Sequence, residues 1–444
     1  HSPRQAVQIG SPITQKLVAD FMEVACAEGL ISCATDCGAG GLASSVGELA
    51  QISGGARVRL EAVPLKYAGL RPWEIFLSEA QERMTLVVAP RHRARVAELA
   101  AHYEVELTEI GAFTDTGDLE VLFGDRPVAC LDLEFLHHGV PRKHLEAEWA
   151  RPALAEPDLP AGLDAGEVLL RLLGSADICS RESVIRRYDH EVKGKTVVKP
   201  LMGPAGVAPQ DAAVLRLDHD GYRGIAVACG IAPRYADLDA YHSSAGAFDE
   251  AVRQIIAVGG RLPEPAAGDR TFWSACDNFC LPDSAYHPET NPDGRYKLAQ
   301  LVRMCRALYD LATAYGVPLT SGKDSMKNDF VADGQKISVP PTVLYSMVAA
   351  IEDVRRAVTT DFKQAGDLIY QVGPTRDEMG GSCLYRLLGH LGANVPRVRP
   401  EAAAARYRRL SAAIGRGLVA SCHDLSAGGL AVALAASCFG GGRG

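Results

Sequence analysis

The sequence has no run of about 18 consecutive apolar residues and no secretory signal, so neither a membrane span nor export is expected. It has no paired C-x2-C ribbon, and a structural zinc site is therefore not expected from its twelve cysteines. A Walker A loop, G-x-x-x-x-G-K-[ST], is also missing. The net charge of −8 gives no basic face for non-specific nucleic-acid binding. These absences predict a cytoplasmic protein with reduced thiols that binds neither membranes nor nucleic acid.

What is present is an ordinary globular composition. The chain has 444 residues, of which 47% are hydrophobic and 23% charged. This length predicts two to four domains, at roughly 100–200 residues per domain. The acidic balance still permits phosphorylated ligands, because a local basic pocket or a helix N-terminus can hold them.

The first part of the chain alternates helix-like and strand-like patterns. Residues 13–30 place apolar side chains at helical spacing, which predicts one buried helical face: Leu17, Val18, Phe21, Met22 and Ala25. Residues 30–36 and 83–90 are short apolar runs and predict buried strands. The pattern is typical of an α/β domain.

A proline-rich stretch separates this part from the next. Four prolines with mixed charge in residues 139–165 predict a linker. The clearest later elements are two predicted helices, 248–258 and 296–316, and two predicted strands, 342–351 and 366–372. The sequence therefore predicts four parts: 1–138, 139–165, 166–352 and 353–444.

A long-range internal repeat links the two ends of the chain. "GLISCATDCGAGGLASS" begins at Gly29 and "GLVASCHDLSAGGLAVA" begins at Gly417. Their alignment places Asp36 on Asp424, 388 residues apart, which is far too long for a solenoid repeat. It predicts two homologous halves, with a chain that starts inside the second part of one half and stops inside the second part of the other.

The repeated D-x-x-A-G-G-L element has two interpretations. Adjacent glycines let the backbone approach a ligand closely, and an aspartate at a strand end can hold Mg²⁺ or a hydroxyl. The alternative is a tight strand-to-helix turn with no ligand. A second open case is "LSEAQERM", residues 77–84, a polar run that is either a binding segment or an exposed loop.

The predicted second domain carries carboxylates, lysines and glycines in several separate segments. Glu250 and Gln254 lie one helical turn apart and share a face. Asp211 precedes a predicted strand, Asp277 follows a strand-like segment, and residues 322–325 form a predicted turn. Such a set suits Mg–ATP, because oxygen ligands hold Mg²⁺ while cations and backbone N–H groups hold phosphates. Any one of these residues alone is typical of a solvated surface.

Five motifs in order, "TDCGAGGL", "LSEAQERM", "YDHEVKG", "DNFC" and "SGKDSMKND", together with the repeat, resemble the synthetase part of the phosphoribosylformylglycinamidine synthase family. The resemblance covers nearly the whole chain. It implies an α/β (α+β) fold of tandem aminoimidazole ribonucleotide synthetase-like domains, ATP-binding and C-terminal-type. The fold is internally duplicated as a pseudo-dimer, and the chain is truncated at both ends.

The resemblance also implies a reaction. ATP phosphorylates the formamide oxygen of formylglycinamide ribonucleotide, and ammonia from a glutaminase subunit or domain then displaces phosphate to give the amidine. Mg²⁺ and ATP or ADP are the implied cofactors. The alternative within the family is a non-catalytic half that holds ADP structurally. A metal or redox protein built on the C-x3-C pairs is a third hypothesis.

Site residues follow from the same resemblance, position by position. The implied substrate contacts are Gln8, Glu79, Ala80, Gln81 and Ser325. The implied nucleotide contacts are Tyr188, Asp277, Gly322 and Lys323. The implied metal ligands are Asp36, Asp189, Glu250, Gln254 and Asp324.

Three of these residues depart from the family pattern, which has Ser at Ala80 and Asn at Gln254 and Lys323. No catalytic residue is named, because the family's catalytic histidines precede His1, and the chain alone is expected to be inactive.

Overall fold

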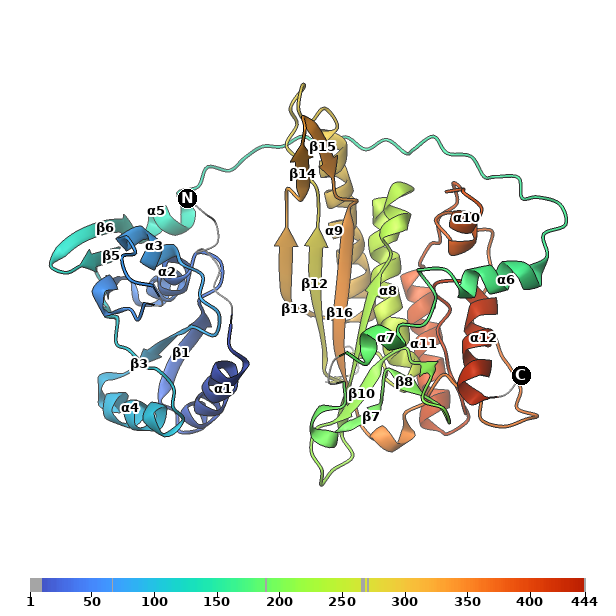
Figure 1. Cartoon of the computed structure of the whole chain (residues 1–444), viewed down its shortest axis with the longest axis horizontal. Helices are drawn as coiled ribbons and strands as arrows, with labels where there is room; N and C mark the ends of the chain where they lie inside the picture. Colours follow the sequence, from blue (N-terminus) through green and yellow to red (C-terminus); the bar gives the residue numbers. More distant parts are fainter. Residues whose placement is uncertain (1–9, 66, 188–189, 265–267, 270, 443–444) are drawn as a thin grey trace. The chain divides into compact units, whose positions relative to one another are not determined.

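The computed structural model describes residues 10–65, 67–187, 190–264, 268–269 and 271–442 (Figure 1). Two compact units divide the chain, one ending at His144 and the other starting at Leu145. Each unit has its own hydrophobic cores and is described separately.

In its described residues, 10–65 and 67–144, the first unit contains two small sheets and five α-helices. Its elements are α1 (Pro12–Ala27), β1 (Ile31–Asp36), α2 (Leu42–Ser53), β2 (Ala56–Arg59), α3 (Pro72–Leu77), β3 (Met84–Val88), α4 (Arg93–His102), β4 (Gly111–Phe113), β5 (Asp118–Phe123), β6 (Arg126–Asp132) and α5 (Leu133–His138). Strands β1 and β3 pair antiparallel, and the other sheet has the order β4-β2-β5-β6. The predicted helix and both predicted strands are confirmed.

Helix α1 shows why the sequence pattern worked here. Pro12 occupies the first turn, where its missing N–H costs no hydrogen bond. Phe21 and Ala25 are buried against Val96 and Leu99 of α4, as the helical spacing predicts. Strand β1 is less buried than predicted, because only its alternate side chains are covered and the others face outward.

The second unit is built on a six-stranded sheet with the order β13-β12-β16-β11-β10-β7. Its strands are β7 (Thr196–Val198), β8 (Leu201–Met202), β9 (Ala208–Pro209), β10 (Ala213–Arg216), β11 (Gly224–Ile231), β12 (Trp273–Cys280), β13 (Leu319–Ser325), β14 (Asp329–Ala332), β15 (Gln335–Ser338) and β16 (Thr342–Ile351). β12 and β13 are parallel, while the other neighbours in this sheet are antiparallel. β8–β9 and β14–β15 form two small hairpins.

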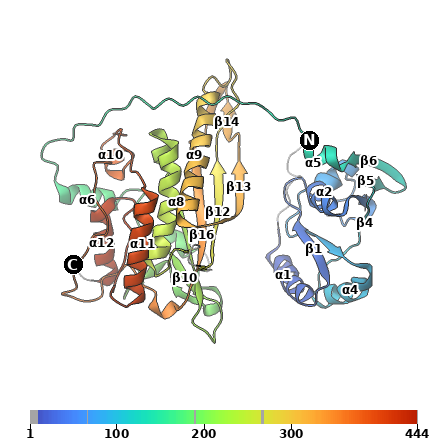
Figure 2. The ribbon, with the colours of Figure 1, turned by 180° about the vertical axis from the view of Figure 1, so that it is seen from behind.

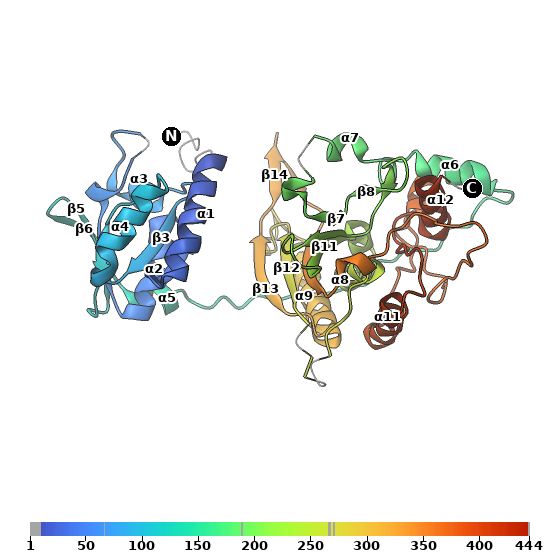
Figure 3. The same cartoon turned by 90° about the horizontal axis from the view of Figure 1, so that it is seen from below.

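Helices cover one face of that sheet. The helices of this unit are α6 (Ala165–Leu173), α7 (Glu182–Ile185), α8 (Ala240–Ala257), α9 (Gly294–Tyr315), α10 (Cys383–Leu387), α11 (Pro400–Gly415) and α12 (Gly429–Gly441). Helices α8 and α9 lie side by side against the sheet, and α11 lies beyond them (Figures 1 and 2). The view in Figure 3 shows the same layers from below. The helices and the strand predicted at 248–258, 296–316 and 342–351 are confirmed.

The core explains this layering. On β16, the alternate residues Val343, Tyr345 and Met347 are buried, which is the period-2 pattern of a strand covered on one face. They meet Phe248 of α8 and Met304 of α9 in one continuous cluster. Burial of this apolar surface is the main force that holds helices and sheet together.

The strand predicted at residues 366–372 is wrong. The structure gives this segment no strand, and Leu368, Ile369 and Tyr370 expose 77%, 65% and 77% of their surface. Within the described residues no strand pairs with it, and an unpaired apolar run cannot form a ladder of hydrogen bonds.

Residues 146–156, which we call the strap, contain no helix or strand but pack on the second unit. The Trp149 ring stacks on Tyr296 with centroids 5.3 Å apart, and the Arg303 guanidinium lies 4.3 Å from the Trp149 ring centroid. Arg303 also binds Asp239, whose side chain caps α8. The strap thus connects to the N-terminal ends of two core helices.

The far end of the strap is fixed by Glu156. Its carboxylate accepts hydrogen bonds from the backbone N–H groups of Ala393 and Asn394, and from the Tyr385 hydroxyl at 3.0 Å. Backbone donors with no other partner hold a carboxylate strongly.

All twelve cysteines are free thiols. Across the described helices, none combines the length and the apolar character that crossing a bilayer requires.

Candidate functional site

The predicted site residues fall in both units. Gln8, Tyr188 and Asp189 lie outside the described residues. The others form three groups, one in the first unit and two in the second.

In the first unit, the Asp36 turn and the 79–81 segment meet at the same end of the β1–β3 pair. Asp36 is opposite Met84 in the register, and the Cys37 N–H donates to the Arg83 carbonyl at 3.0 Å. Asp36 is exposed, as is Gln81, while Glu79 is half-buried. Asp36 and Glu79, which are 43 residues apart in sequence (79 − 36), therefore lie in segments that present polar side chains at one place.

Gly41 is what allows this close approach. Its φ of +58° is a left-handed conformation, and an added Cβ would lie 2.3 Å from the Ser78 carbonyl oxygen. The same carbonyl accepts a hydrogen bond from the Arg83 guanidinium, at 2.5 Å. Beneath the turn, the hydroxyls of Ser45 and Thr85 are hydrogen-bonded at 2.9 Å and both are buried. The double glycine therefore has a packing role as well as any role in binding.

In the second unit, Asp277 and Gly322 are direct neighbours on the parallel strands β12 and β13. The Asp277 carboxylate lies against Gly322, because a Cβ there would be 2.4 Å from its Oδ1. Burial raises the pKa of Asp277, and the nearby Asp324 carboxylate raises it further. Two close carboxylates beside an open glycine suit a hydrated cation such as Mg²⁺, which takes oxygen ligands.

The predicted turn at residues 322–325 is wrong, because these residues lie in strand β13 and pair with β12. Alternation along the strand places Gly322 and Asp324 on one face and Lys323 and Ser325 on the other. Lys323 donates to the Ser325 hydroxyl. One face of β13 therefore carries the implied nucleotide contact Gly322 and the implied metal ligand Asp324. The opposite face carries the implied nucleotide contact Lys323 and the implied substrate contact Ser325.

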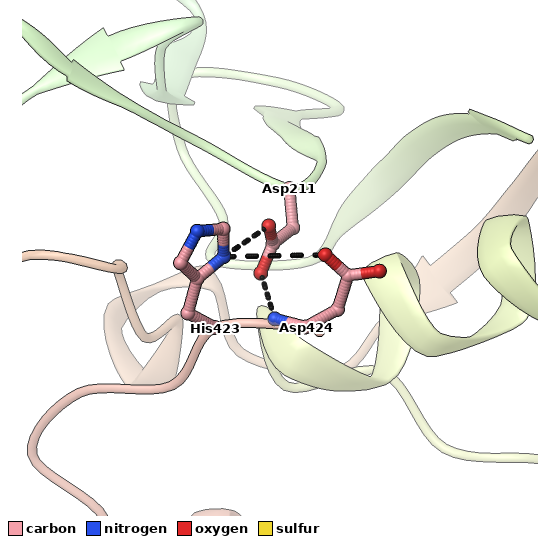
Figure 4. Close-up of side chains that lie close together, drawn as sticks. All are labelled: Asp211, His423 and Asp424. Carbon is pink, nitrogen blue, oxygen red and sulfur yellow. Dashed lines mark hydrogen bonds and ion pairs between the residues drawn. The ribbon is translucent and has the colours of Figure 1, made fainter. Parts of the chain in front are cut away.

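The third group surrounds the second copy of the repeat (Figure 4). The Nδ1 of His423 lies 2.7 Å from Asp211 Oδ1, and the Asp424 N–H donates to Asp211 Oδ2 at 3.0 Å. Burial, and then the Asp211 carboxylate, raises the pKa of Asp424 to about 7. Burial, the largest single cause, favours neutral His423, but the hydrogen bond with Asp211 and the negative charges of Asp211 and Asp424 together raise the pKa of His423.

The predicted pair Glu250 and Gln254 lies on α8 beside this group. The Glu250 carboxylate accepts from the Ile231 N–H at 2.9 Å, and burial raises its pKa. Among the described residues, no hydrogen bond joins Gln254 to the cluster. Arg253, between the two, binds both Asp249 and Asp424.

Sequence reasoning missed Arg253 and His423. Arg253 lies 171 residues from Asp424, and His423 lies 212 residues from Asp211, so only the fold shows these contacts. One signal was available, because His423 directly precedes the repeated aspartate where the first copy has Thr35.

Within the described chain, a single set of three side chains meets the spacing of a metal site: Asp211, His423 and Asp424 have ligand atoms within 4.8 Å of one another. It does not fit Mg²⁺ well. Mg²⁺ needs an octahedral shell of oxygens, whereas this set offers an imidazole and lies beside the Arg253 cation. Asp277 with Asp324 fits Mg²⁺ better.

The chain is similar to known proteins along its whole length. The family model "AIR synthase related protein, C-terminal domain" matches residues 1–124 and 364–444. Phosphoribosylformylglycinamidine synthase subunit PurL of Streptomyces coelicolor is 34% identical, over all of this chain and 56% of that protein. The same subunit of Ignicoccus hospitalis is 36% identical, over 97% of this chain and 57% of that protein. The chain thus spans just over half the length of these curated relatives.

Solved structures agree. Thermotoga maritima PurL complexed with ADP has a TM-score of 0.59 and 25% identity, over 79% of this chain and 52% of that one. The T. maritima protein complexed with FGAR has a TM-score of 0.56 and 25% identity, over 79% of this chain and 50% of that one.

Proposed function

Because the chain belongs to the phosphoribosylformylglycinamidine synthase family, we propose that it is part of an enzyme that converts formylglycinamide ribonucleotide to the amidine, with ATP and ammonia. One observation carries the proposal. The Asp36 turn and the Glu79–Gln81 segment, far apart in sequence, converge at one end of β1–β3. The related T. maritima protein is complexed with FGAR, which supports a ribonucleotide substrate.

The chemistry activates an unreactive amide. The product formylglycinamidine ribonucleotide keeps its formyl group, so the reacting oxygen is that of the glycinamide carbonyl and not the formamide oxygen expected from the resemblance. This oxygen attacks the γ-phosphorus of ATP, the amide N–H proton is lost, the bond from this phosphorus to the β–γ bridging oxygen breaks, and ADP leaves. Ammonia then adds to the activated carbon and loses a proton, and the C–O bond breaks as phosphate departs. Mg²⁺, when bound, would offset the negative charge that accumulates on the phosphoryl oxygens.

The chain's own residues supply positions for these groups. We assign Glu79 and Gln81 to hydrogen bonds with the substrate, and Asp36 to the cation beside it. Ala80 contributes no side-chain hydroxyl. Asp277 and Asp324, next to the open backbone at Gly322, are assigned to the cation and nucleotide of the second unit.

Ammonia must come from another protein or domain. We propose a glutaminase subunit or domain as its source, because the curated relatives are themselves named as subunits. The cytoplasm is the compartment that we propose, since all twelve cysteines are free thiols.

Calorimetric titration of the 444-residue chain with formylglycinamide ribonucleotide tests the proposal without requiring turnover. Gln81→Ala should raise the Kd about tenfold, because one or two hydrogen bonds to a charged or polar ligand are lost. Glu98→Gln on the exposed face of α4 is the control and should leave the Kd unchanged. Equal affinity in the wild type and Gln81→Ala would remove the substrate assignment.

A further inference from the structure

The two copies of the repeated aspartate lie in opposite environments. Asp36 is exposed at the end of β1, whereas Asp424 exposes only 8% of its surface. The same motif therefore presents an open carboxylate in the first unit and an enclosed one in the second. An enclosed carboxylate requires a nearby counter-charge or hydrogen-bond donors to offset the loss of water.

Arg253 supplies that counter-charge. Its guanidinium Nη2 lies 3.3 Å from Asp424 Oδ2, and its Nη1 binds Asp249 one helical turn earlier on α8. The pairing with Asp249 holds the side chain along the helix, so Arg253 needs little further ordering to reach Asp424. A fixed positive charge thus lies among the carboxylates where the family resemblance implies a metal.

The other acceptors near Arg253 already have partners. Asp249 accepts hydrogen bonds from the hydroxyls of Tyr315 and Tyr407. Asp211 accepts from the Asp424 N–H and lies in hydrogen-bond contact with His423. A divalent ion would have to break several of these contacts and lie next to the guanidinium.

We propose that Arg253 is the resident cation of this second site, in place of a divalent metal, and that it joins α8 to the turn at Asp424. The inference goes beyond the proposed function and does not rest on it, because it concerns a site that needs no substrate.

Thermal unfolding of the 444-residue chain, with and without Mn²⁺, tests this. Arg253→Met removes the charge, keeps most of the apolar stem and leaves two enclosed carboxylates uncompensated. The Tm should fall by roughly 6–20 °C, the range expected for one broken buried ion pair in a unit of this size. The Tm of Arg253→Lys, which keeps a positive charge, should fall much less. Gln254→Met, the matched control on the next residue of α8, should lower the Tm only slightly.

Mn²⁺ tests whether the Arg253 guanidinium occupies the place that a divalent metal ion would otherwise take. It should raise the Tm of Arg253→Met, whose carboxylates are free to bind it, and this rise should vanish when Asp424→Asn is added. Because the wild-type site is proposed to hold no divalent metal, the Asp211→Asn variant should bind as many Mn²⁺ ions as the wild type in a calorimetric titration. This measurement does not depend on how well the Arg253→Met variant folds. One Mn²⁺ fewer in Asp211→Asn, or an unchanged Tm in Arg253→Met, would overturn the proposal.

Discussion

The hydroxyl of Tyr407 donates to the carboxylate of Asp249, at 2.8 Å from Oδ1 and 3.0 Å from Oδ2. Tyr407 is on α11 and Asp249 on α8, and Tyr315 of α9 binds the same carboxylate. All three side chains are buried. A single carboxylate thus joins the three helices that pack behind the sheet.

Tyr407→Phe should therefore destabilise the second unit. The variant keeps the ring but removes the donor, at a cost of about 1–3 kcal/mol for a buried acceptor that loses a partner. Urea unfolding followed by circular dichroism measures the change. Tyr309→Phe is the matched control, because Tyr309 of α9 is 62% exposed, and its effect should be close to zero. Equal effects of the two substitutions would contradict this account.

Gly41→Ala tests the close approach in the first unit. Gly41 combines a φ of +58° with a ψ of −130°, a backbone conformation that costs a non-glycine residue about 1–3 kcal/mol by itself. The added Cβ would also meet the Ser78 carbonyl, so the backbone must shift and substrate affinity should fall as well.

Gly29→Ala separates these two effects. Gly29 has a similar φ of +67°, but nothing lies within 4 Å of its added Cβ. It should show the conformational cost alone and leave ribonucleotide affinity unchanged in the same titration. The account would be contradicted if Gly41→Ala had the same free energy of unfolding as Gly29→Ala and the ribonucleotide affinity of the wild type. The close approach of Gly41 to Ser78 would then affect neither stability nor binding.

The pH dependence of stability has a defined sign at Asp424. Its pKa rises from 3.8 to about 7 on folding, so its contribution is fully present below about pH 4 and is lost as the pH rises to 7. Asp424→Asn should flatten this decline in a series of urea unfolding curves from pH 4 to 8. An unchanged slope would show that the carboxyl does not titrate in this window.

Asp353→Asn provides a control of opposite sign. The hydrogen bond from Arg355 lowers the pKa of this half-buried carboxyl to about 2. Its contribution is present above pH 4 and is lost only as the pH falls from about 4 towards 2. The slope of the Asp353→Asn chain between pH 4 and 8 should therefore match that of the wild type.

The strap gives a prediction that hydrogen exchange can check. Glu156→Ala removes the acceptor of the Ala393 and Asn394 N–H groups, so both amides should exchange faster. Glu148→Ala is the control, because Glu148 is in the same segment but pairs with the half-buried Arg295 at 2.8 Å and not with Ala393 or Asn394. Unchanged exchange at Ala393 in Glu156→Ala would show that the strap is not held at this end.

Periodicity predicted the elements with one long covered face, such as α9 and β16, because their apolar spacing reports burial directly. It failed at residues 366–372 because an apolar run does not show whether a partner strand exists. The sequence also predicted a turn at residues 322–325, whereas the pairing with β12 makes that segment a strand.

The candidate site, like the fold, was predicted only in part. The repeat predicts that Asp36 and Asp424 are equivalent positions, and the resemblance implies that Glu250 is a metal ligand. Neither indicated that Asp424 is enclosed, or that Arg253 and His423 reach it from other parts of the chain. Charge compensation depends on distances across the fold, which a single sequence does not contain.

The strap has a practical consequence for dividing the protein. Composition alone suggests a cut near residue 165, where the prolines end and α6 begins. Such a cut would remove Trp149 and Glu156, and so expose the ring of Tyr296 and the two amides that Glu156 binds. A version that starts at Leu145 keeps these partners, so the physical edge of the second unit lies some twenty residues before its first helix.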